Sequence, residues 1–324
     1  MSETAFIVTI DTEGDDLWAA PREITTRNAR HLPRFQALCE RYGYKPVYLV
    51  AHEMAMSDEF TEFARDVADR GAGEIGMHLH AWNSPPLEPL TADDFRHQPY
   101  LIEYPDRVMK EKIKTLTGLL EERFDQKMTS HRAGRWAFDK RYAAMLLELG
   151  YRVDCSVTPG IDWRGNPGDP RGKGGADYSA FPDSPYFLDP SDISRPAPRG
   201  LLEVPMTIQP AALYRRARWA YRLPLLRRAA NWISQGQRWL YPAKSPVDAM
   251  LGAAHQARAE GAVHLEFMLH SSELMPGGSP AFRSVAQLER LYDDLERLFE
   301  NLRSWCRGAT LSEFHAAVCS GAVQ

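Results

Sequence analysis

Strand-like and helical segments alternate along most of this 324-residue chain, and this alternation limits the folds that it can adopt. Apolar and β-branched runs indicate seven strands, at residues 6–10, 46–50, 74–79, 128–131, 151–157, 201–208 and 263–269. Amphipathic spacing indicates helices between and after them, at residues 28–42, 57–70, 106–124, 138–149, 247–260 and 285–305. The crossover between parallel strands usually contains a helix, so this order predicts a parallel α/β fold.

The first strand-like run ends in an unusual cluster of acids. Four carboxylates occur within six positions: Asp11, Glu13, Asp15 and Asp16. Close carboxylates repel one another and are costly to bury, so stability alone does not favour them at the end of a buried strand. The carboxyl ends of parallel strands are where α/β proteins place metal ligands and general bases. A solvated acidic turn or a helix N-cap is the alternative interpretation.

Imidazoles, an arginine and further acids follow the other predicted strands. They are His78 and His80, His131 with Arg132, Asp154, and His270. In a parallel barrel these strand ends converge on one face, so residues distant in sequence can share a cleft. Two imidazoles and a carboxylate are ligands that zinc and other first-row divalent metals accept, with positions left for water and substrate. For His78 and His80, the alternative is that side chains at i and i+2 merely share one face of an edge strand.

Composition and charge exclude several classes of protein. The net charge of −4 gives no reason to expect a nucleic-acid partner. The four cysteines are scattered without a CxxC pair, which argues against a disulfide framework and fits a reducing compartment. No apolar run approaches the ~20 residues that span a bilayer, and the first residues lack the pattern of a signal peptide. We therefore expect a cytoplasmic protein.

Five segments, taken in order, resemble the motifs of a known family. They are residues 9–13 (TIDTE), 74–80 (EIGMHLH), 132–136 (RAGRW), 154–156 (DCS) and 269–270 (LH). In order and spacing they are similar to the polysaccharide deacetylases, or NodB-homology domains, of carbohydrate esterase family four, over nearly the whole chain. The resemblance implies a catalytic base at Asp11, metal ligands at Glu13, His78 and His80, an arginine that orients the base at Arg132, and a general acid at His270.

The chain departs from that family's pattern at two positions. The usual adjacent aspartates are replaced by Asp-x-Glu, which makes Glu13 rather than residue 12 the acidic ligand. The family's histidines stand at i and i+4, but Trp82 occupies that second position, so the resemblance supports His78 more strongly than His80. The His-x-His-x-Trp and His-Ser-Ser-Glu-Leu motifs resemble those of a bacterial branch of the family that is associated with gene sets for envelope or lipopolysaccharide sugars.

Other residues beside these motifs are candidates for substrate binding. Trp82 and Trp136 could stack on a sugar ring, or they could pack in the core. Asp154 belongs to a segment that forms a groove wall in the family. Asp15 could bind a sugar hydroxyl or support the metal ligands, and a solvated turn is its alternative.

Three further polar residues lie within predicted strands. On a strand, His131 should point away from the side of Arg132, so we expect it to be a hydrogen-bonded core histidine. His264 and Glu266 alternate with apolar residues of the last predicted strand, and they could line the barrel or pair with each other.

A basic and aromatic stretch stands between the sixth and seventh predicted strands. No acid occurs between Glu203 and Asp248, whereas residues 214–244 hold eight arginines and lysines interleaved with tryptophan, tyrosine and leucine. Helices that lie in a membrane interface have this composition. We predict a basic helical insertion at residues 211–245, for which peripheral contact with the anionic inner membrane surface is one interpretation. A basic helical hairpin packed on the barrel or on a second subunit is the alternative.

Together these features predict a single domain over residues 1–324, an irregular (β/α)7-type barrel of parallel strands. The implied activity is that of a metal-dependent hydrolase that removes an acetyl or formyl group from an amino sugar, in a lipid-linked or envelope glycan precursor. Zinc is the expected metal, with cobalt, nickel, manganese or iron as alternatives. Two rival functions remain open, a metal-independent hydrolase of C–N bonds in a small amide and a carbohydrate- or lipid-binding barrel without turnover.

Overall fold

Seven parallel strands form the centre of the computed structural model, which describes residues 3–210 and 237–323. They are β1 (Thr4–Thr12), β2 (Val47–Val50), β3 (Glu74–Leu79), β4 (Ser130–Ala133), β5 (Val153–Asp154), β8 (Leu202–Glu203) and β11 (His264–His270). Their order is β11-β1-β2-β3-β4-β5-β8, and every neighbouring pair is parallel. All seven predicted strands are present, which confirms the predicted α/β fold with an irregular parallel barrel.

Single hydrogen bonds, rather than a strand ladder, join β11 to the chain that follows β8. Within the described residues no ladder pairs β8 with β11. Instead, Thr207 N donates to Glu266 O over 3.3 Å. Leu240 lies between the two segments: its N–H donates to Thr207 O, and its carbonyl oxygen accepts from Met268 N, each over 3.1 Å. These bonds close the barrel without a regular eighth strand, which accounts for its irregular shape.

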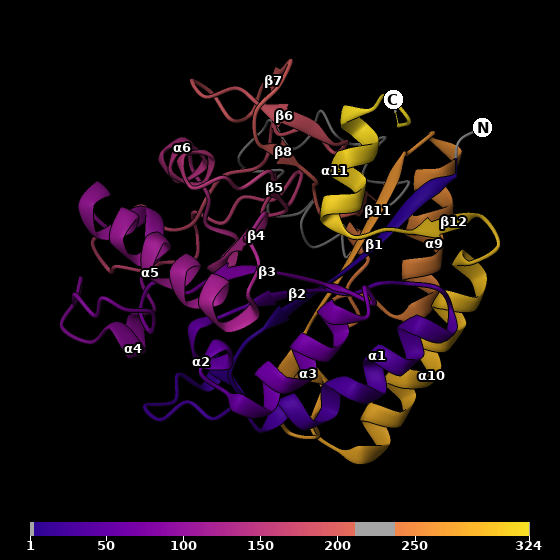
Figure 1. Cartoon of the computed structure of the whole chain (residues 1–324), viewed down its shortest axis with the longest axis horizontal. Coiled ribbons are helices and arrows are strands. Elements are labelled where there is room, and N and C mark those ends of the chain that lie inside the picture. The colour runs from indigo at the N-terminus through magenta and orange to yellow at the C-terminus, as the bar shows by residue number, and fades with distance from the viewer. Residues whose placement is uncertain (1–2, 211–236, 324) are drawn as a thin grey trace, which may run out of the picture.

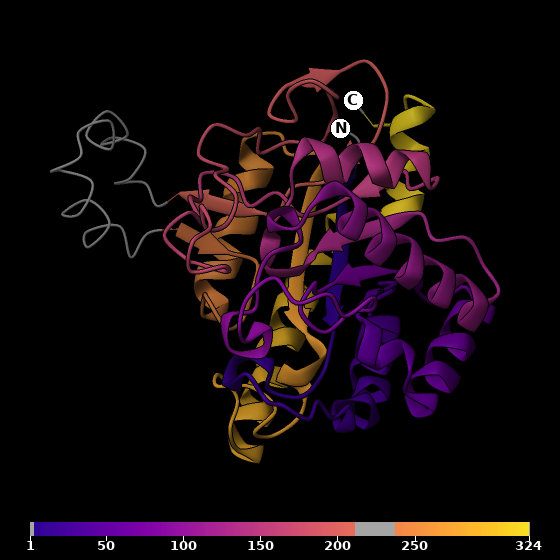
Figure 2. The ribbon, with the colours of Figure 1, turned by 90° about the vertical axis from the view of Figure 1, so that its left-hand side faces the viewer.

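Helices cover the outside of the strands. Figure 1 shows α1, α3 and α10 along one side and α5 and α6 along another, and in Figure 2, which is turned by 90°, α5 and α6 face the viewer. The longer helices are α1 (Leu32–Arg41), α3 (Asp58–Asp69), α5 (Asp106–Phe124), α6 (Lys140–Glu148), α9 (Val247–Ala259) and α10 (Val285–Leu302). In α3, the Ser57 side chain caps the first turn at Phe60 N, and Phe60, Ala64 and Val67 form the buried stripe of an amphipathic helix.

A helix that the sequence analysis did not predict, α11 (Leu311–Cys319), packs against the amino ends of the strands. Figure 1 shows it at the same end of the barrel as the start of β1. Leu311 and Phe314 belong to one buried cluster with residues that lie in four strands or directly after them, namely Ala5, Ile7, Val47, Leu49, Val153, Cys155, Leu202 and Val204. This apolar layer fills one end of the barrel and leaves the opposite end for polar residues.

Shorter elements complete the described chain. An antiparallel hairpin of β6 and β7 extends the sheet beyond β8, and β12 pairs with β1. The bounds of the short strands are β6 (Tyr186–Leu188), β7 (Pro196–Ala197), β9 (Ile208–Pro210), β10 (Gln237–Trp239) and β12 (Cys306–Gly308). The short helices are η1 (Leu17–Ala19), η2 (Arg27–His31), α2 (His52–Ala55), α4 (Asp94–His97), η3 (Leu101–Glu103), η4 (Gly134–Trp136) and η6 (Ser271–Leu274).

The predicted basic insertion is described only in its last part. Residues 211–236 lie outside the described residues, so the predictions of a helix and of membrane contact there are untested. Residues 237–239 form β10, the antiparallel partner of β9, and this strand corrects the prediction of a helix up to residue 245. The side chain of Trp239 explains the strand, because it is buried and packs in the barrel's main hydrophobic cluster. Among the described helices, none combines the length and apolar character that a membrane span requires.

Candidate active site

Four strands bring the predicted site residues to the carboxyl end of the barrel. Asp11 on β1 pairs with His270 on β11, and His78 on β3 pairs with Arg132 on β4. Side chains alternate along a strand, so Asp11 and Glu13, two positions apart, point to the same side. Residues separated by more than 250 positions in the sequence therefore face one volume at the end opposite α11.

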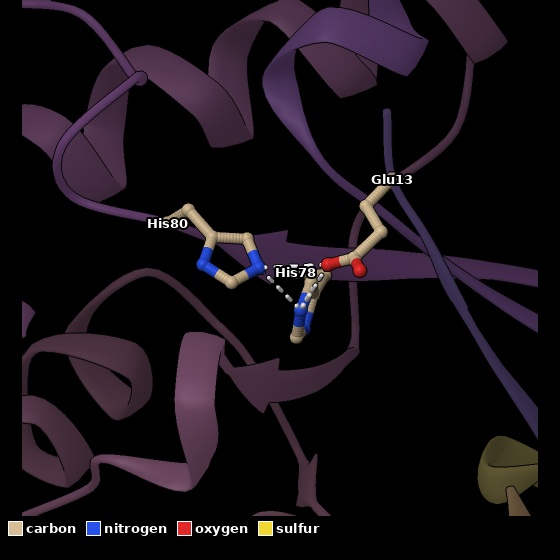
Figure 3. Close-up of side chains that lie close together, drawn as sticks. All are labelled: Glu13, His78 and His80. Atoms are coloured by element: carbon tan, nitrogen blue, oxygen red, sulfur yellow. Dashed lines mark hydrogen bonds and ion pairs between the residues drawn. The ribbon is translucent and has the colours of Figure 1, made fainter. Parts of the chain in front are cut away.

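Glu13, His78 and His80 point toward one another, as Figure 3 shows. Glu13 Oε2 lies 2.8 Å from His80 Nε2 and 3.6 Å from His78 Nε2, and the two Nε2 atoms are 3.1 Å apart. All three side chains are buried. His80 joins this trio despite its unusual spacing, because residues at i and i+2 at the end of a strand share one side.

The donor atoms of the trio fit a divalent metal. In a tetrahedral zinc site with bonds of about 2.0–2.1 Å, ligand atoms lie about 3.3 Å apart, and the three separations here span 2.8 to 3.6 Å. His78 Nδ1 lies 3.0 Å from the carbonyl oxygen of Arg132, so Nδ1 carries a proton, and Nε2, which faces Glu13 and His80, is the nitrogen that would bind a metal after losing its own proton. Metal-ligating histidines usually have such a second partner. Among residues 3–210 and 237–323, this is the one group of three potential ligands with suitable geometry.

A buried arginine joins two carboxylates beside the trio. Arg132 Nη1 donates to Asp11 Oδ1 over 2.6 Å, and Nη2 donates to Thr9 Oγ1 over 2.8 Å and to Glu266 Oε1. Burial alone would raise the pKa of Asp11, but the charges of Arg132 and of the imidazoles of His78 and His270 lower it below its usual value. Asp11 is therefore ionised at neutral pH, and its second oxygen, Oδ2, is not bonded to the guanidinium.

His270, at the end of β11, is held by Tyr241 and Glu273. The His270 Nδ1 atom lies 3.1 Å from Tyr241 Oη, which donates to Glu273 Oε1 over 2.7 Å, and Glu273 Oε2 accepts from the backbone N–H of His270 over 2.9 Å. His270 Nε2 then faces the site, 3.8 Å from Asp11 Oδ2 and 3.9 Å from Glu13 Oε1. Burial would lower the pKa of His270, but the carboxylates of Glu13, Glu273 and Asp11 outweigh it and raise the pKa to about 9.

Asp15, which we predicted to bind substrate, is engaged inside the protein instead. Its Oδ2 atom accepts hydrogen bonds from Thr25 Oγ1 at 2.7 Å and from Arg27 Nε at 3.0 Å. Its Oδ1 atom accepts from the Asn28 side chain at 2.8 Å and from the Asn28 backbone at 3.0 Å. These bonds use both carboxylate oxygens, so Asp15 fixes the turn after β1 and is not free to bind a sugar hydroxyl.

Asp154 is likewise a structural residue rather than a wall of the site. It has no exposed surface, and its Oδ1 atom lies 2.6 Å from His131 Nδ1 and 2.9 Å from Ser156 Oγ. The other ring nitrogen of His131 lies 2.7 Å from the hydroxyl of Tyr142. His131 is therefore the hydrogen-bonded core histidine that we expected, and Asp154 is its partner instead of a contact for substrate.

The two predicted tryptophans differ in their access to solvent. Trp82 is buried, with its ring centroid 6.0 Å from His80 and 5.5 Å from Phe95, which favours the packing interpretation. Trp136 is partly exposed, and the guanidinium carbon of Arg132 lies 4.9 Å from its ring centroid. Stacking of a substrate on Trp136 stays a prediction.

Glu266 is a site residue that the sequence analysis left without a role. It does not pair with His264, whose Nε2 atom bonds to the carbonyl oxygen of Pro205 at 2.9 Å. Instead, Glu266 contacts Arg132 and Thr9 inside the barrel. A signal existed in the sequence, because Glu266 stands four residues before His270 and so faces the same side of the strand. Tyr241 had no such signal, since it follows an irregular segment.

Comparisons with known proteins establish the fold. No family model matches the sequence, and no curated protein does. The structure is similar to that of a candidate polysaccharide deacetylase from Mycobacterium smegmatis, with a TM-score of 0.57 and 13% identity over 100% of this chain and 93% of that one. It is also similar to a candidate glycoside hydrolase/deacetylase from Parabacteroides distasonis, with a TM-score of 0.58 and 9% identity over 98% of this chain and 72% of that one.

A third similar structure bears the name of a different enzyme. It is 4-alpha-glucanotransferase from Thermococcus litoralis, with a TM-score of 0.54 and 12% identity over 98% of this chain but only 40% of that one. At such low identities the likeness concerns the fold, and it confirms the barrel that the deacetylase resemblance implied. Because proteins of one fold catalyse different reactions, the function has to be argued from the site itself.

Proposed function

We propose that this protein is a metal-dependent hydrolase that removes an N-acyl group from an amino sugar. The observation that carries the proposal is the position of Asp11 and His270 beside the trio of Glu13, His78 and His80. Asp11 Oδ2 and His270 Nε2 lie 3.8 Å apart, and each also lies within 3.9 Å of an atom of the trio. A base, an acid and a set of metal donors thus border one volume, as hydrolysis of an amide requires.

Glu13 Oε2, His78 Nε2 and His80 Nε2 would hold the metal. Two neutral imidazoles and one carboxylate form the ligand set of several catalytic zinc sites, which keep a further position open for water or substrate. We therefore propose zinc. When bound, such an ion supplies Lewis acidity that polarises the acyl carbonyl and acidifies water. The buried Arg132 carbonyl at His78 Nδ1 keeps that ring in the tautomer that can bind it.

Asp11 serves as the general base. Its Oδ1 atom is held by Arg132, which leaves Oδ2 to accept a proton from the attacking water as the water oxygen bonds to the acyl carbon. The same guanidinium keeps the carboxylate ionised, because it lowers the pKa against the effect of burial. Arg132 is therefore a positioning residue that acts through Asp11.

His270 serves as the general acid. With a pKa of about 9 its ring is protonated at neutral pH, and Nε2–H can donate to the amine nitrogen as the C–N bond breaks. The chain from His270 Nδ1 through Tyr241 to Glu273 fixes the ring orientation. After turnover, Asp11 carries a proton and His270 lacks one. The 3.8 Å separation allows that proton to return after a small side-chain movement, which restores both groups.

The test is release of acetate or formate from a panel of N-acetyl and N-formyl amino sugars. Protein purified without chelator should contain about one equivalent of zinc and should lose activity when the metal is stripped and regain it when zinc is returned. Release that survives complete removal of metal would favour a metal-independent amidohydrolase. Sugar binding without release under any metal condition would favour a binding barrel. The proposal is refuted if the protein neither binds nor hydrolyses any sugar of the panel.

The substrate that we propose is a lipid-linked or envelope glycan precursor at the inner membrane surface. Support comes from the composition of residues 214–244, which hold eight cations and no acid, and from the resemblance to an envelope-associated branch. The protein should then sediment with anionic phosphatidylglycerol vesicles at low ionic strength and remain free with neutral ones. Replacing Arg215, Arg216, Arg218 and Arg222 together with glutamine should abolish sedimentation with the anionic vesicles. If the same variant instead changes the molecular mass in light scattering, this stretch joins two subunits.

A further inference from the structure

Trp18 is a large aromatic side chain that the fold leaves in solvent beside the site. In the described residues, five large apolar side chains are exposed, and Trp18, at 45% exposure, is the one aromatic among them. Its ring centroid lies 5.0 Å from that of His270, with the two planes at 75°. Exposure of a tryptophan is unfavourable because the ring carries a large apolar surface, so its position beside the site calls for a reason.

The backbone around Trp18 is fixed on both sides. Asp16 and Ala20, at the two ends of η1, adopt left-handed conformations with φ of 45° and 50°. The Asp16 N–H donates to Gly278 O over 2.9 Å, the Leu17 carbonyl accepts from the Gln98 side chain over 3.0 Å, and the Leu17 side chain is buried. Non-glycine residues in this conformation are uncommon and gather at ligand sites. The turn therefore presents the indole ring in a set position.

Of the site side chains, the one that contacts Trp18 is the most exposed. The His270 side chain keeps 15% of its surface exposed, against 9% for His80 and 4% each for Asp11 and Glu13. A substrate that reaches the site beside His270 would therefore meet Trp18. In the proposed reaction His270 protonates the amine, so the amine half of the substrate lies on its side of the scissile bond and the acyl half lies toward the trio.

We propose that Trp18 is the platform on which the sugar ring that carries the scissile amide stacks. This inference rests on the proposed function and names the part of the substrate that the site recognises. A pyranose has an apolar C–H face that suits an indole ring and hydroxyls at its edge that need polar partners. His270 lies beside Trp18, Asp16 belongs to the same turn, and the Gln98 side chain bonds to that turn at Leu17 O. Such polar groups are better partners for the hydroxyls of a sugar than for an alkyl chain.

The test compares Trp18→Ala and Trp18→Phe with the wild type and with Leu147→Ala. Leu147 is an exposed apolar residue of α6 and serves as the matched control. Two quantities are measured: kcat and KM for the best N-acetyl amino sugar of the panel, and the Kd of the corresponding free amino sugar by calorimetry. Trp18→Ala should raise both KM and Kd roughly tenfold or more with kcat nearly unchanged. Trp18→Phe should keep most of the affinity, and Leu147→Ala should change nothing.

Each other outcome has a definite meaning. If Trp18→Ala lowers kcat while the Kd for the free amino sugar is unchanged, Trp18 only supports the His270 ring and the inference is wrong. The inference also fails if Trp18→Ala and Trp18→Phe both bind and turn over the sugar as the wild type does. If the wild type deacetylates no sugar but binds the free amino sugar through Trp18, the proposed function fails while the platform stands. If it neither binds nor deacetylates any sugar, both fail.

Discussion

Arg132 and Asp11 form a buried ion pair across the inside of the barrel, with 2.6 Å between Nη1 and Oδ1. They come from β4 and β1, which are separated in the sheet by β2 and β3. The other arm of the same guanidinium contacts Glu266 on β11. One buried cation therefore contacts two carboxyl groups and favours the ionised form of each, although burial still raises the pKa of Glu266. This arrangement links the stability of the barrel to the charge state of the proposed base.

The first prediction concerns this shared cation. Arg132→Met leaves two carboxylates without a counter-charge and should lower the free energy of unfolding by about 3–5 kcal/mol. Adding Glu266→Gln to that variant removes one of them and should restore about 1 kcal/mol or more, whereas Glu266→Gln alone should be destabilising. Urea denaturation of metal-free protein at pH 7 measures all four species. If Glu266→Gln has the same effect in both backgrounds, the two side chains are not coupled.

The second prediction separates the catalytic groups from the metal donors. Asp11→Asn keeps an acceptor for Arg132 but cannot take a proton, and His270→Ala removes the proton donor. Each should lower turnover by roughly 10²-fold or more, the scale of a lost general base or acid. Zinc content, measured by elemental analysis, should equal that of the wild type. Full activity in either variant would refute the role assigned to that residue, and loss of zinc would identify the residue as a metal ligand instead.

The third prediction tests His80 through its neighbour Gly134. A Cβ atom on Gly134 would lie 2.5 Å from Leu79 O and 2.8 Å from His80 Nδ1, so Gly134→Ala should displace the imidazole. If His80 is a ligand, zinc affinity should fall by about 10–100-fold, as it does when the support of a ligand is lost. Competition with a chromophoric chelator measures this. Gly118→Ala in α5 is the control, because nothing lies within 4 Å of its added methyl group.

Outcomes of this pair of variants are distinct. Gly118→Ala should leave zinc affinity unchanged and stabilise the helix by about 0.5–1 kcal/mol. A folded Gly134→Ala protein with wild-type zinc affinity would remove His80 from the ligand set. The His78→Ala variant should lose zinc whichever result Gly134→Ala gives, because it removes a ligand. The position of His78 does not depend on Gly134, since the Arg132 carbonyl orients its ring.

The strands and the three residues of the trio followed from the sequence because both depend on local patterns. Apolar runs mark buried strands, and polar residues directly after them must lie at the carboxyl end of a parallel barrel. The contacts of Asp15 and Asp154 did not follow, because the partners of Asp15 come from an irregular turn and the contact of Asp154 with His131 depends on the register between β4 and β5. Tyr241 and Trp18 were missed for a related reason, since an irregular segment carries no periodicity that shows where its side chains point.

The helix α11 was missed because its position is set by tertiary packing. Its sequence is short, and a nine-residue helix is marginal without contacts. Leu311 and Phe314 gain those contacts only once the barrel offers an open apolar end. The role of Glu266 also depends on the barrel, because Arg132 and Thr9 reach it from two other strands. In each case the missing information was a neighbour in space, which spacing along one chain does not supply.

The last prediction concerns the stability of the fold in acid. His264 is buried near α11, with Nε2 bonded to Pro205 O at 2.9 Å, and its Nδ1 atom has no partner among the described residues. Burial lowers its pKa to about 4, against 6.5 for an exposed histidine, and the bond to Pro205 offsets only part of this effect. Because the folded-state pKa is the lower one, the unfolded chain takes up the proton first as the pH falls below 6.5. Stability contributed by neutral His264 is therefore present above that pH and is lost progressively between pH 6.5 and 4.

Between pH 7 and pH 5 this group alone should lower the free energy of unfolding by about 2 kcal/mol. Glutamine can donate to the same carbonyl without titrating, so the loss between these two pH values should be smaller by about that amount in His264→Gln. Urea denaturation at both pH values measures the difference, and every other titrating group is common to the two proteins. Equal losses in the wild type and in His264→Gln would mean that His264 takes up its proton in the folded state as readily as in the unfolded chain. The buried Nδ1 atom would then have to gain an acceptor, which none of the described residues offers it.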